Sequence, residues 1–526
     1  MKENNADIHP GSMPECSPKS LMLLFFLLLC VVTAKAQNSV LQTRVTLPRQ
    51  TTTVYALLNQ ISNQTGYFFI YDSQLINNNQ RVSIRRQRRE MQQWLDEILN
   101  DPSLRYRVVQ NHILIFRPAL SAPEPVNPIE PAPQPTHFTV RGRLLDKNTG
   151  VPLPYASVGI PERGLGIATN NDGVFQLRLP LDVIDKSLKV SYMGYKSQEL
   201  PLRLLHGTQM DIIMEADYIS MQEVIIRYYD PKAIMVEALA KRKVNYSQTP
   251  VYLLSFYREG VQRNNKYINY SEAIFRLYKQ PYGNPFAVDQ VMMLKARNIT
   301  NVDNTDTLVL KLKAGVQSAL ELDIMKHFPD FLDEGAFDKY EFESAGIASI
   351  SGRNVYAIRF SQNPRLKEPL FQGNIYIDIE TLAFVEADFE LNPKFINRAQ
   401  HRFFTSRNPG YVVNIEKASY QISFQEYKGH YHLNHVRGEV QMKFKKRGQL
   451  FSNTYRAFLE MAVCHIDDQN VQRFSRREVL RPHTAFIDHG YKYDDDFWGQ
   501  YNIITPEVRI SEALSQMRSK IESFIP

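Results

Sequence analysis

Residues 138–226 decide how the middle of this chain folds. They contain Phe138-Thr-Val-Arg-Gly-Arg-Leu-Leu-Asp146, Pro152-Leu-Pro-Tyr-Ala-Ser-Val158, Val174-Phe-Gln-Leu177 and Val190-Ser-Tyr-Met-Gly-Tyr195. Turn signals separate these apolar segments, most clearly Asn171-Asp-Gly173, because Asn and Gly accept positive φ angles. Short alternating strands at this spacing predict a small antiparallel β-sandwich. Such a module binds other molecules or supports neighbouring domains, and it has no catalytic residues of its own.

The same segments resemble the carboxypeptidase-D regulatory-like domain. The residues that carry the resemblance are Val140-Arg-Gly142, Pro152–Val158, Ala168-Thr-Asn-Asn-Asp-Gly-Val-Phe175, Val190–Tyr195 and Glu223-Val-Ile225. The family name implies no peptidase chemistry here. A zinc carboxypeptidase needs a His-x-x-Glu pair as metal ligands, and the sequence contains no such pair. In envelope proteins this domain often precedes an outer-membrane barrel, but the 300 residues that follow are too few for a 22-stranded receptor barrel.

Residues 1–36 are expected to be a cleavable export signal. Lys19 precedes the apolar run Leu21–Thr33, and the run ends in Ala34-Lys-Ala36. A basic residue, 7–15 apolar residues and an A-x-A site describe a secretory signal, whereas a membrane span needs ~20 apolar residues. Met13 and Met22 are alternative starts, and lipid attachment at Cys30 is the less favoured alternative to cleavage.

Composition agrees with an exported protein of the periplasm or outer membrane. Removal of the signal leaves Cys464 as the last cysteine, so no internal disulfide can form. An exported chain of about 490 residues without disulfides fits a bacterial periplasm and must rely on buried apolar area. The net charge of +7 then favours anionic envelope surfaces or acidic partners, and export makes nucleic acid an unexpected partner.

Residues 37–117 predict a small α+β domain. Thr53 is a candidate cap for a helix with Leu57, Leu58 and Ile61 on one face, and Gly66 ends it. The order β-α-β-β-α-β-β resembles the secretin and TonB N-terminal domain. The resemblance is carried by Leu58-Asn-Gln-Ile61, Thr65-Gly-Tyr-Phe-Phe-Ile-Tyr71, Trp94-Leu-Asp-Glu-Ile-Leu99 and Ile113-Leu-Ile115. It implies a periplasmic protein-interaction module.

An arginine cluster in this domain is the one candidate docking surface. It consists of Arg81, Arg85, Arg86, Arg88 and Arg89. The interpretation that requires no function is a solvated loop before the second helix. The functional one is docking of an acidic partner or an anionic surface, since clustered like charge repels itself unless something offsets it.

Residues 118–136 form a proline-rich linker with seven prolines and no apolar period. Such a segment is extended and holds its neighbours apart. Residues 137–226 are the expected sandwich domain, and residues 227–526 are a β-rich α+β domain. The predicted fold class is therefore multidomain and mainly β.

The C-terminal domain is predicted to be a large antiparallel meander. Asp230-Pro231 predicts a helix start, and a second helical stretch is expected over 318–332. Period-two strands follow, for example Ala383-Phe-Val-Glu-Ala-Asp-Phe389, in which Glu386 and Asp388 lie opposite the apolar face. Residues 373–389 resemble the central strands of outer-membrane lipoprotein-carrier half-barrels. Two interpretations stay open: a sheet filled by its own side chains, and a sheet that holds a ligand.

Possible reactive groups are few. His430 and His432 share a strand face while His435 points away, so two imidazoles face one side without a third ligand placed by the spacing. Asp494, Asp495 and Asp496 lack the glycine and spacing of a calcium loop. No nucleophile elbow, phosphate loop or paired cysteine motif is present. The sequence therefore predicts no catalytic residue, no metal and no cofactor.

These observations favour a non-enzymatic envelope binding protein, accessory to outer-membrane transport or to lipid and lipoprotein handling. Its C-terminal domain would bind an apolar ligand, and an envelope protein partner is expected. The alternative is a periplasmic signalling or TonB-linked coupling protein that docks through its N-terminal domain. A hydrolase with unmarked carboxylates is a third possibility, because carboxylate pairs leave no sequence trace.

Overall fold

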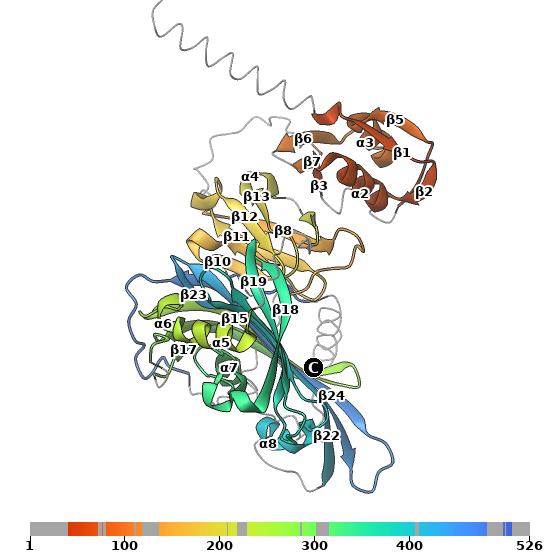
Figure 1. Ribbon diagram of the computed structural model, residues 1–526. Coiled ribbons are helices and arrows are strands. Elements are labelled where there is room, and N and C mark those ends of the chain that lie inside the picture. Colours follow the sequence, from red (N-terminus) through yellow and green to blue (C-terminus); the bar gives the residue numbers. More distant parts are fainter. Residues whose placement is uncertain are drawn as a thin grey trace, which may run out of the picture. The chain divides into compact units, whose positions relative to one another are not determined.

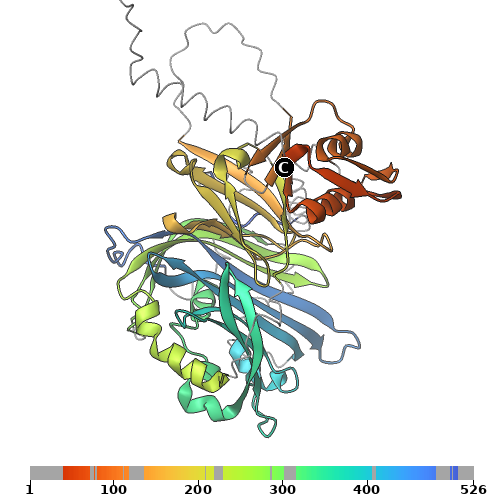
Figure 2. The ribbon, with the colours of Figure 1, turned by 45° about the horizontal axis from the view of Figure 1, so that its top comes forward.

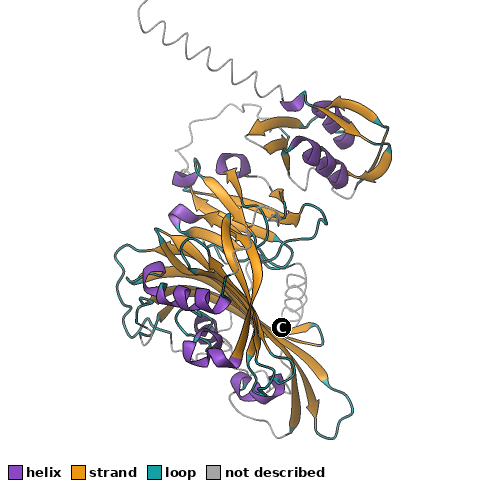
Figure 3. Cartoon of the chain, in the orientation of Figure 1, coloured by secondary structure: helices purple, strands orange, loops and turns teal. Residues whose placement is uncertain are grey.

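The computed structural model describes residues 40–71, 76, 80–109, 112–117, 136–207, 209–217, 229–284, 287–300, 315–404, 410–480, 498–499 and 501–507. The chain divides into two compact units, Met1–Val126 and Asn127–Pro526, which are described separately. The expected export signal, most of the linker and Asp494–Asp496 lie outside the described residues. The multidomain, mainly β fold class is confirmed (Figure 3).

The first unit packs two helices against short strands. Its elements are β1 (Arg44–Leu47), β2 (Gln50–Thr53), α2 (Val54–Thr65), β3 (Phe68–Tyr71), β4 (Arg81–Ile84), β5 (Gln87–Glu90), α3 (Met91–Leu99), β6 (Arg105–Val109) and β7 (His112–Phe116). Strand β1 pairs with β5, β2 pairs with β4, and β7 lies between β3 and β6. Figure 1 labels these elements. The unit has its own apolar core around Leu57, Ile61, Trp94 and Leu95.

The predicted helix at Thr53 is confirmed. The Thr53 side chain accepts a hydrogen bond from the Ala56 amide at 3.2 Å and so satisfies one free donor of the first turn. Gly66 ends the helix with a positive φ of 75°, a conformation that glycine adopts without strain. The second helix is held to β1, because the Trp94 indole donates to the Val45 carbonyl at 3.0 Å.

Residues 137–214 form two packed layers. One is the sheet of β11 (Val174–Pro180), β8 (His137–Asp146) and β14 (Gln209–Met214). The other contains β13 (Gln198–Pro201), β12 (Ser187–Ser191), β9 (Ser157–Ile160) and β10 (Leu165–Ala168). The expectation of a purely antiparallel sandwich is wrong in one place, since β14 pairs with β8 in parallel. We call these two layers the sandwich.

A large curved antiparallel sheet follows. Its order is β17 (Gln290–Thr300), β16 (Lys266–Lys279), β15 (Val251–Arg263), β24 (Asn453–Asp467), β23 (His430–Lys446), β22 (Tyr411–Tyr427), β21 (Phe384–Leu391), β20 (Phe371–Asp378), β19 (Arg353–Gln362) and β18 (Tyr340–Ile350). Leu165 of β10 pairs with His465 of β24, so the second sandwich layer continues into this sheet.

Tight turns fix the register of this sheet. Asn264 and Asn265 between β15 and β16 both have positive φ, and so do Lys428 and Gly429 between β22 and β23. Consecutive positive φ values are typical of the two-residue hairpin turn whose twist matches that of the strands. The long hairpins therefore align side chains over more than ten residues.

Helices cover one face of the large sheet, which we call the inner face (Figures 1 and 2). They include α5 (Pro231–Ala240), α6 (Arg242–Asn245) and α7 (Val316–Glu321). The predicted start of α5 is confirmed, since the Asp230 side chain caps the helix at the Lys232 amide and Pro231 is its first residue. The helical stretch expected over 318–332 is confirmed only at its two ends, because α7 ends at Glu321 and the chain turns before the short 3-10 helix Asp330–Leu332.

The inner face holds the main apolar core, which includes Leu253, Phe275, Phe331, Ile375 and Val436. Two further helical segments, α8 (Gln400–Phe403) and the 3-10 turn Ile396–Ala399, cover the far end of β22. Among the described residues, none of the helices is long and apolar enough to cross a bilayer.

Candidate functional site

A row of polar side chains crosses the opposite, outer face of the large sheet. Each strand contributes one member, and each member is the register partner of the member on the next strand. The side chains therefore point to the same side of the sheet. From β18 to β17 the row reads Glu343, Arg359, Asn374, Asp388, Gln421, Arg437, Glu460, Arg258, Glu272 and Arg297. We call it the charge row.

One end of the charge row is fully buried. The side chains of Arg258, Glu460 and Glu272 have no exposed area. Arg258 Nε lies 2.5 Å from Glu460 Oε2, and Arg297 Nη2 lies 2.5 Å from Glu272 Oε2. Burial alone would raise the pKa of Glu460, but the charges of Arg258 and Arg437 outweigh burial and hold that pKa well below its ordinary value. Glu460 is therefore a structural anion.

A C-terminal segment, of which residues 498–499 and 501–507 are described, covers this buried end. The Trp498 ring lies 5.8 Å from the Phe256 ring and 5.2 Å from the Arg297 guanidinium. Asn502 accepts a hydrogen bond from the Arg178 amide at 2.6 Å and donates to the Arg178 carbonyl at 3.1 Å. The segment thus joins the sandwich to the outer face.

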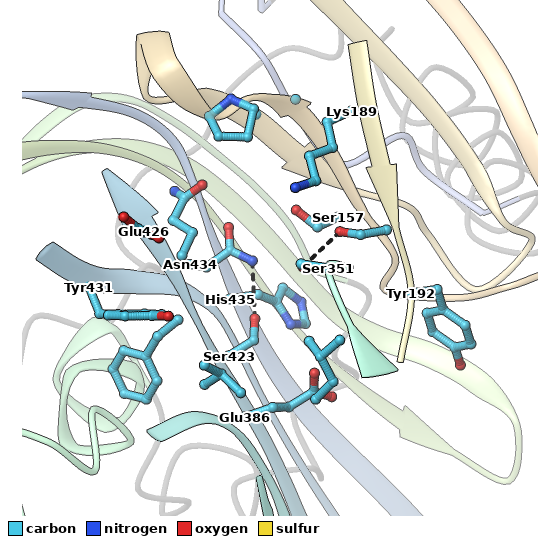
Figure 4. Close-up of a pocket in the computed structure, with 18 of the residues that line it drawn as sticks. Ser157, Lys189, Tyr192, Ser351, Glu386, Ser423, Glu426, Tyr431, Asn434 and His435 are labelled. Carbon is cyan, nitrogen blue, oxygen red and sulfur yellow. Dashed lines mark hydrogen bonds between the residues drawn. The ribbon is translucent and has the colours of Figure 1, made fainter. Parts of the chain in front are cut away.

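The other end of the charge row borders open space. A cleft of about 580 Å³ lies between the sandwich and strands β21 to β23 of the outer face (Figure 4). A second, shallower cavity of about 660 Å³ continues from it over Arg359, Asn374 and Asp388. Tyr155 and Gln421 line both. We call the first cavity the interface cleft.

Two contacts hold the walls of the interface cleft together. Ser351, at the β18–β19 turn, donates to Ser191 of β12 at 3.1 Å, and the Gly194 amide donates to the Ser349 carbonyl at 2.9 Å. On the floor, Asn434 donates to Ser423 at 3.1 Å. Figure 4 shows Ser351, Ser423 and Asn434 around the cavity, together with Lys189 and Glu386.

Glu386 lies at the base of the interface cleft and has an unusual charge environment. No described side chain donates a hydrogen bond to it or forms an ion pair with it. Burial raises the pKa of Glu386 to about 8, and the nearby Asp388 charge adds to the effect. At neutral pH the carboxyl is therefore largely protonated and can both donate and accept a hydrogen bond.

The inner face contains a separate, more apolar cavity of about 390 Å³. It lies between strands β15 and β20–β24 on one side and α7 with the chain that follows it on the other. The apolar lining side chains are Val261, Leu322, Ile324, Phe328, Pro329, Phe371, Phe389, Phe403, Tyr420, Val440, Ala457, Phe458 and Leu459. We call this space the inner cavity.

Gly438 provides part of the space in the inner cavity. It pairs with Tyr420 on one side and Leu459 on the other, and both of these residues line the cavity. A Cβ atom at Gly438 would meet Tyr420, Leu322 and Leu459 at 3.4–3.6 Å, which is ordinary van der Waals contact. The glycine therefore leaves room that a larger side chain would fill without a backbone clash.

The predicted arginine cluster does not form one uniform surface. Arg81 lies on β4, Arg85 and Arg86 follow that strand, and Arg88 lies on β5; all four are exposed. Arg89 is different, because it forms an ion pair with Glu97 at 2.5 Å and its guanidinium lies 5.5 Å from the Trp94 ring centre. The segment expected as a solvated loop instead contains the short strands β4 and β5.

The three histidines have different environments. His430 is exposed, whereas His432 and His435 are buried. A bulge between Ser423 and Phe424 interrupts the alternation, so Leu433 and Val436 both enter the core. His435 then faces the outer side, where its Nε2 lies 2.8 Å from Glu460 Oε1 and its ring stacks on Tyr155. Within the described part of the chain, no three His, Cys, Asp or Glu side chains gather as a metal site.

Sequence reasoning identified Glu386 and Asp388 only as the polar side of a strand. It did not find the charge row or the interface cleft, because both depend on the pairing of strands far apart in the chain. Arg258 and Glu460 are separated by 202 residues, and no local pattern relates them. The one usable signal was the run of charged residues at every second position.

Comparison with known proteins gives a partial assignment. No curated protein matches the chain. Similar solved structures include a DUF1329 family protein from Desulfovibrio piger, at 13% identity and a TM-score of 0.20, with 46% of this chain and 96% of that chain covered. A lipovitellin structure titled for its lipid–protein interactions has 7% identity and a TM-score of 0.22, with 45% and 27% covered. Likeness at these TM-scores supports no argument about fold or function. One family does match: residues 140–226, which include most of the sandwich, form a CarboxypepD_reg-like domain.

Proposed function

We propose that the protein is a non-enzymatic binding protein of the cell envelope that holds an apolar ligand in the inner cavity. The single observation that carries the proposal is the apolar lining of that cavity, which is contributed by five adjoining strands, β20 to β24, by β15, and by the segment after α7. Ligand pockets of proteins are typically 300–1,000 Å³ and mainly apolar, and the inner cavity lies within this range.

The binding energy would come from burial of apolar ligand surface. Each square ångström removed from water contributes ~25 cal/mol before the costs of association. The polar groups at the cavity, among them Glu321, His327 and Arg402, suit a ligand with one polar end. A lipid with a single acyl chain has this combination of an apolar body and a polar end.

The envelope location rests on the sequence. The expected export signal, the absence of a second cysteine in the mature chain and the resemblance of residues 37–117 to the secretin and TonB N-terminal domain all support it. A role in lipid or lipoprotein handling beside an outer-membrane transporter agrees with both this location and the apolar inner cavity.

The test is a fluorescence titration of the delipidated full chain with cis-parinaric acid, a fatty acid whose emission increases in apolar surroundings. Gly438→Leu fills the inner cavity and is expected to weaken binding at least tenfold while the melting temperature is preserved. Gly335→Leu is the matched control, because Gly335 is exposed and lies outside the cavity. Equal affinity of the wild type and Gly438→Leu would contradict the proposal.

A second candidate function is docking of an acidic partner through the N-terminal domain, as in a signalling or transport-coupling protein. It is supported by Arg81, Arg85, Arg86 and Arg88, for which the described residues supply no carboxylate partner within ion-pair distance. Replacement of Arg85, Arg86 and Arg88 by Ser is expected to abolish partner capture from an envelope extract. Unchanged capture would rule out docking through this surface. Arg89 stays unchanged in this variant because it stabilises the domain itself.

A further inference from the structure

We infer that the interface cleft is a second binding site, for a neutral polyhydroxylated ligand, which is a sugar. The cleft and the inner cavity lie on opposite faces of the large sheet, so this inference is independent of the apolar ligand proposed above. It rests on the shape of the cleft, the chemistry of its lining and the hydrogen-bonding groups that its walls leave unused.

The cleft is a formed space with fixed walls. Its volume of about 580 Å³ is enough for a small oligosaccharide unit and lies in the usual range of ligand sites. The hydrogen bond from Ser351 to Ser191 and the one from the Gly194 amide to the Ser349 carbonyl fix the sandwich wall against the sheet wall. A site whose walls are already held in place loses little entropy when a ligand binds.

The lining is rich in uncharged hydrogen-bonding groups from both walls. Ser157 comes from the sandwich, and Gln421, Ser423, Gln425 and Asn434 come from the sheet. Hydroxyl and amide groups both donate and accept hydrogen bonds. A ligand that carries hydroxyl groups on all sides matches such a lining, whereas an apolar ligand would leave Gln425 Nε2, which has no described partner, unpaired at a cost of about 1–3 kcal/mol.

Two groups on the sheet wall are unused. The Gln425 Nε2 atom is buried and has no hydrogen-bond partner among the described residues. Glu386 likewise has no described donor, and Figure 4 shows it at the cleft beside Ser423. Buried polar groups are normally paired, and a few unpaired ones at a cavity indicate a missing ligand or water.

Aromatic rings complete the match to a sugar. Tyr155, Tyr192 and Tyr431 all line the cleft. A tyrosine presents an apolar ring and a polar hydroxyl together, and the C–H faces and hydroxyl edges of a sugar ring need both. Tyr155 is held in place by stacking on His435, with the ring centres 5.7 Å apart.

Other ligand classes fit less well. An extended peptide commonly binds by adding a strand to an open sheet edge. The strands that contribute most of the lining, β9, β12, β21, β22 and β23, each have a paired neighbour on both sides, and the edge strands β13 and β18 contribute only Glu199 and Ile350. The charged lining is balanced, because Glu162, Glu199 and Glu426 stand against Lys189, Arg353 and Lys428, so the cleft favours neither a strong anion nor a strong cation.

The experiment uses the full chain with maltose, cellobiose and N-acetylglucosamine as probes. Saturation-transfer NMR detects binding, and calorimetry gives the affinity. Gln425→Leu removes the unpaired donor while it preserves the size of the side chain, and we expect at least tenfold weaker binding. Lys189→Met, which keeps the aliphatic stem and removes the amine that points into the cleft, is expected to weaken binding severalfold. Gln449→Leu, at the exposed β23–β24 turn, is the matched control.

The outcomes are distinct. Binding of a probe that is lost in Gln425→Leu or Lys189→Met and retained in Gln449→Leu supports the inference. It is overturned if none of the three sugars binds, if all variants bind as the wild type does, or if a Gly-Ser peptide competes for the same site and the sugars do not. Gly438→Leu separates the two proposals, because it is expected to lose cis-parinaric acid binding and to keep sugar binding.

Discussion

Arg258 and Glu460 form an ion pair with no exposed area on either side chain, and Arg258 Nε lies 2.5 Å from Glu460 Oε2. Glu460 also contacts Arg437 at 3.2 Å and His435 at 2.8 Å. Burial would lower the pKa of the Arg258 guanidinium, but Glu460 outweighs burial and raises it. The pair lies in the buried end of the charge row, under the sandwich and the C-terminal segment, and so connects three regions of the second unit.

Glu460→Gln is expected to destabilise the second unit by about 3–5 kcal/mol, because it removes the nearer counter-charge of the buried Arg258 and leaves only Glu507, 3.2 Å from Arg258 Nη2. Urea unfolding followed by circular dichroism measures the change. Asp185→Asn is the control: Asp185 pairs with Arg203 at 2.5 Å, but both side chains are about two-thirds exposed. Water and salt screen that exposed pair, so Asp185→Asn is expected to change the stability little. Equal effects of the two substitutions would show that burial of the Glu460 pair is unimportant.

The stability difference between the wild type and Glu460→Gln is expected to shrink in acid. The pKa of Glu460 is depressed in the folded state, so its stabilising contribution is fully present above the ordinary pKa near 4.5. The contribution is lost as the pH falls below that value toward the folded pKa. Urea midpoints of both proteins between pH 3 and pH 7 test this, and a difference that stays constant would contradict it.

Glu386→Gln is expected to stabilise the protein at alkaline pH. The pKa of Glu386 is raised to about 8 in the folded state, so the folded chain binds a proton that the unfolded chain releases between about pH 4.5 and 8. Stability of the wild type therefore falls as the pH rises through this window, by at most roughly 5 kcal/mol. Melting temperatures of the two proteins should agree at pH 4 and diverge in favour of Glu386→Gln at pH 9. Parallel profiles would show that Glu386 titrates normally.

Cys464 is expected to be unreactive in the folded protein. Its side chain is 1% exposed, and burial raises the pKa of the thiol to about 12, so almost no thiolate exists at pH 8. Iodoacetamide at pH 8 should label the Cys464 peptide only after unfolding in urea, as peptide mapping by mass spectrometry would show. Rapid labelling of the native chain would mean that the outer face around β24 opens readily.

Much of the local structure follows from the sequence alone. Thr53 and Asp230 mark helix starts because a side-chain oxygen placed before a helix satisfies its free amides. The alternation from Phe384 to Leu391 predicts a strand with one apolar side, because successive side chains of a strand point to opposite faces. The motifs of residues 140–226 were specific enough to identify the sandwich family.

The tertiary structure decided what those local elements do together. Whether Asp388 stands beside Gln421, and Arg437 beside Glu460, depends on which strands become neighbours and in which register. The parallel pairing of β14 with β8 and the bulge at Ser423 likewise arise from contacts between distant segments. Side-chain periodicity is a property of one strand, whereas the charge row, the interface cleft and the inner cavity are properties of many strands packed together.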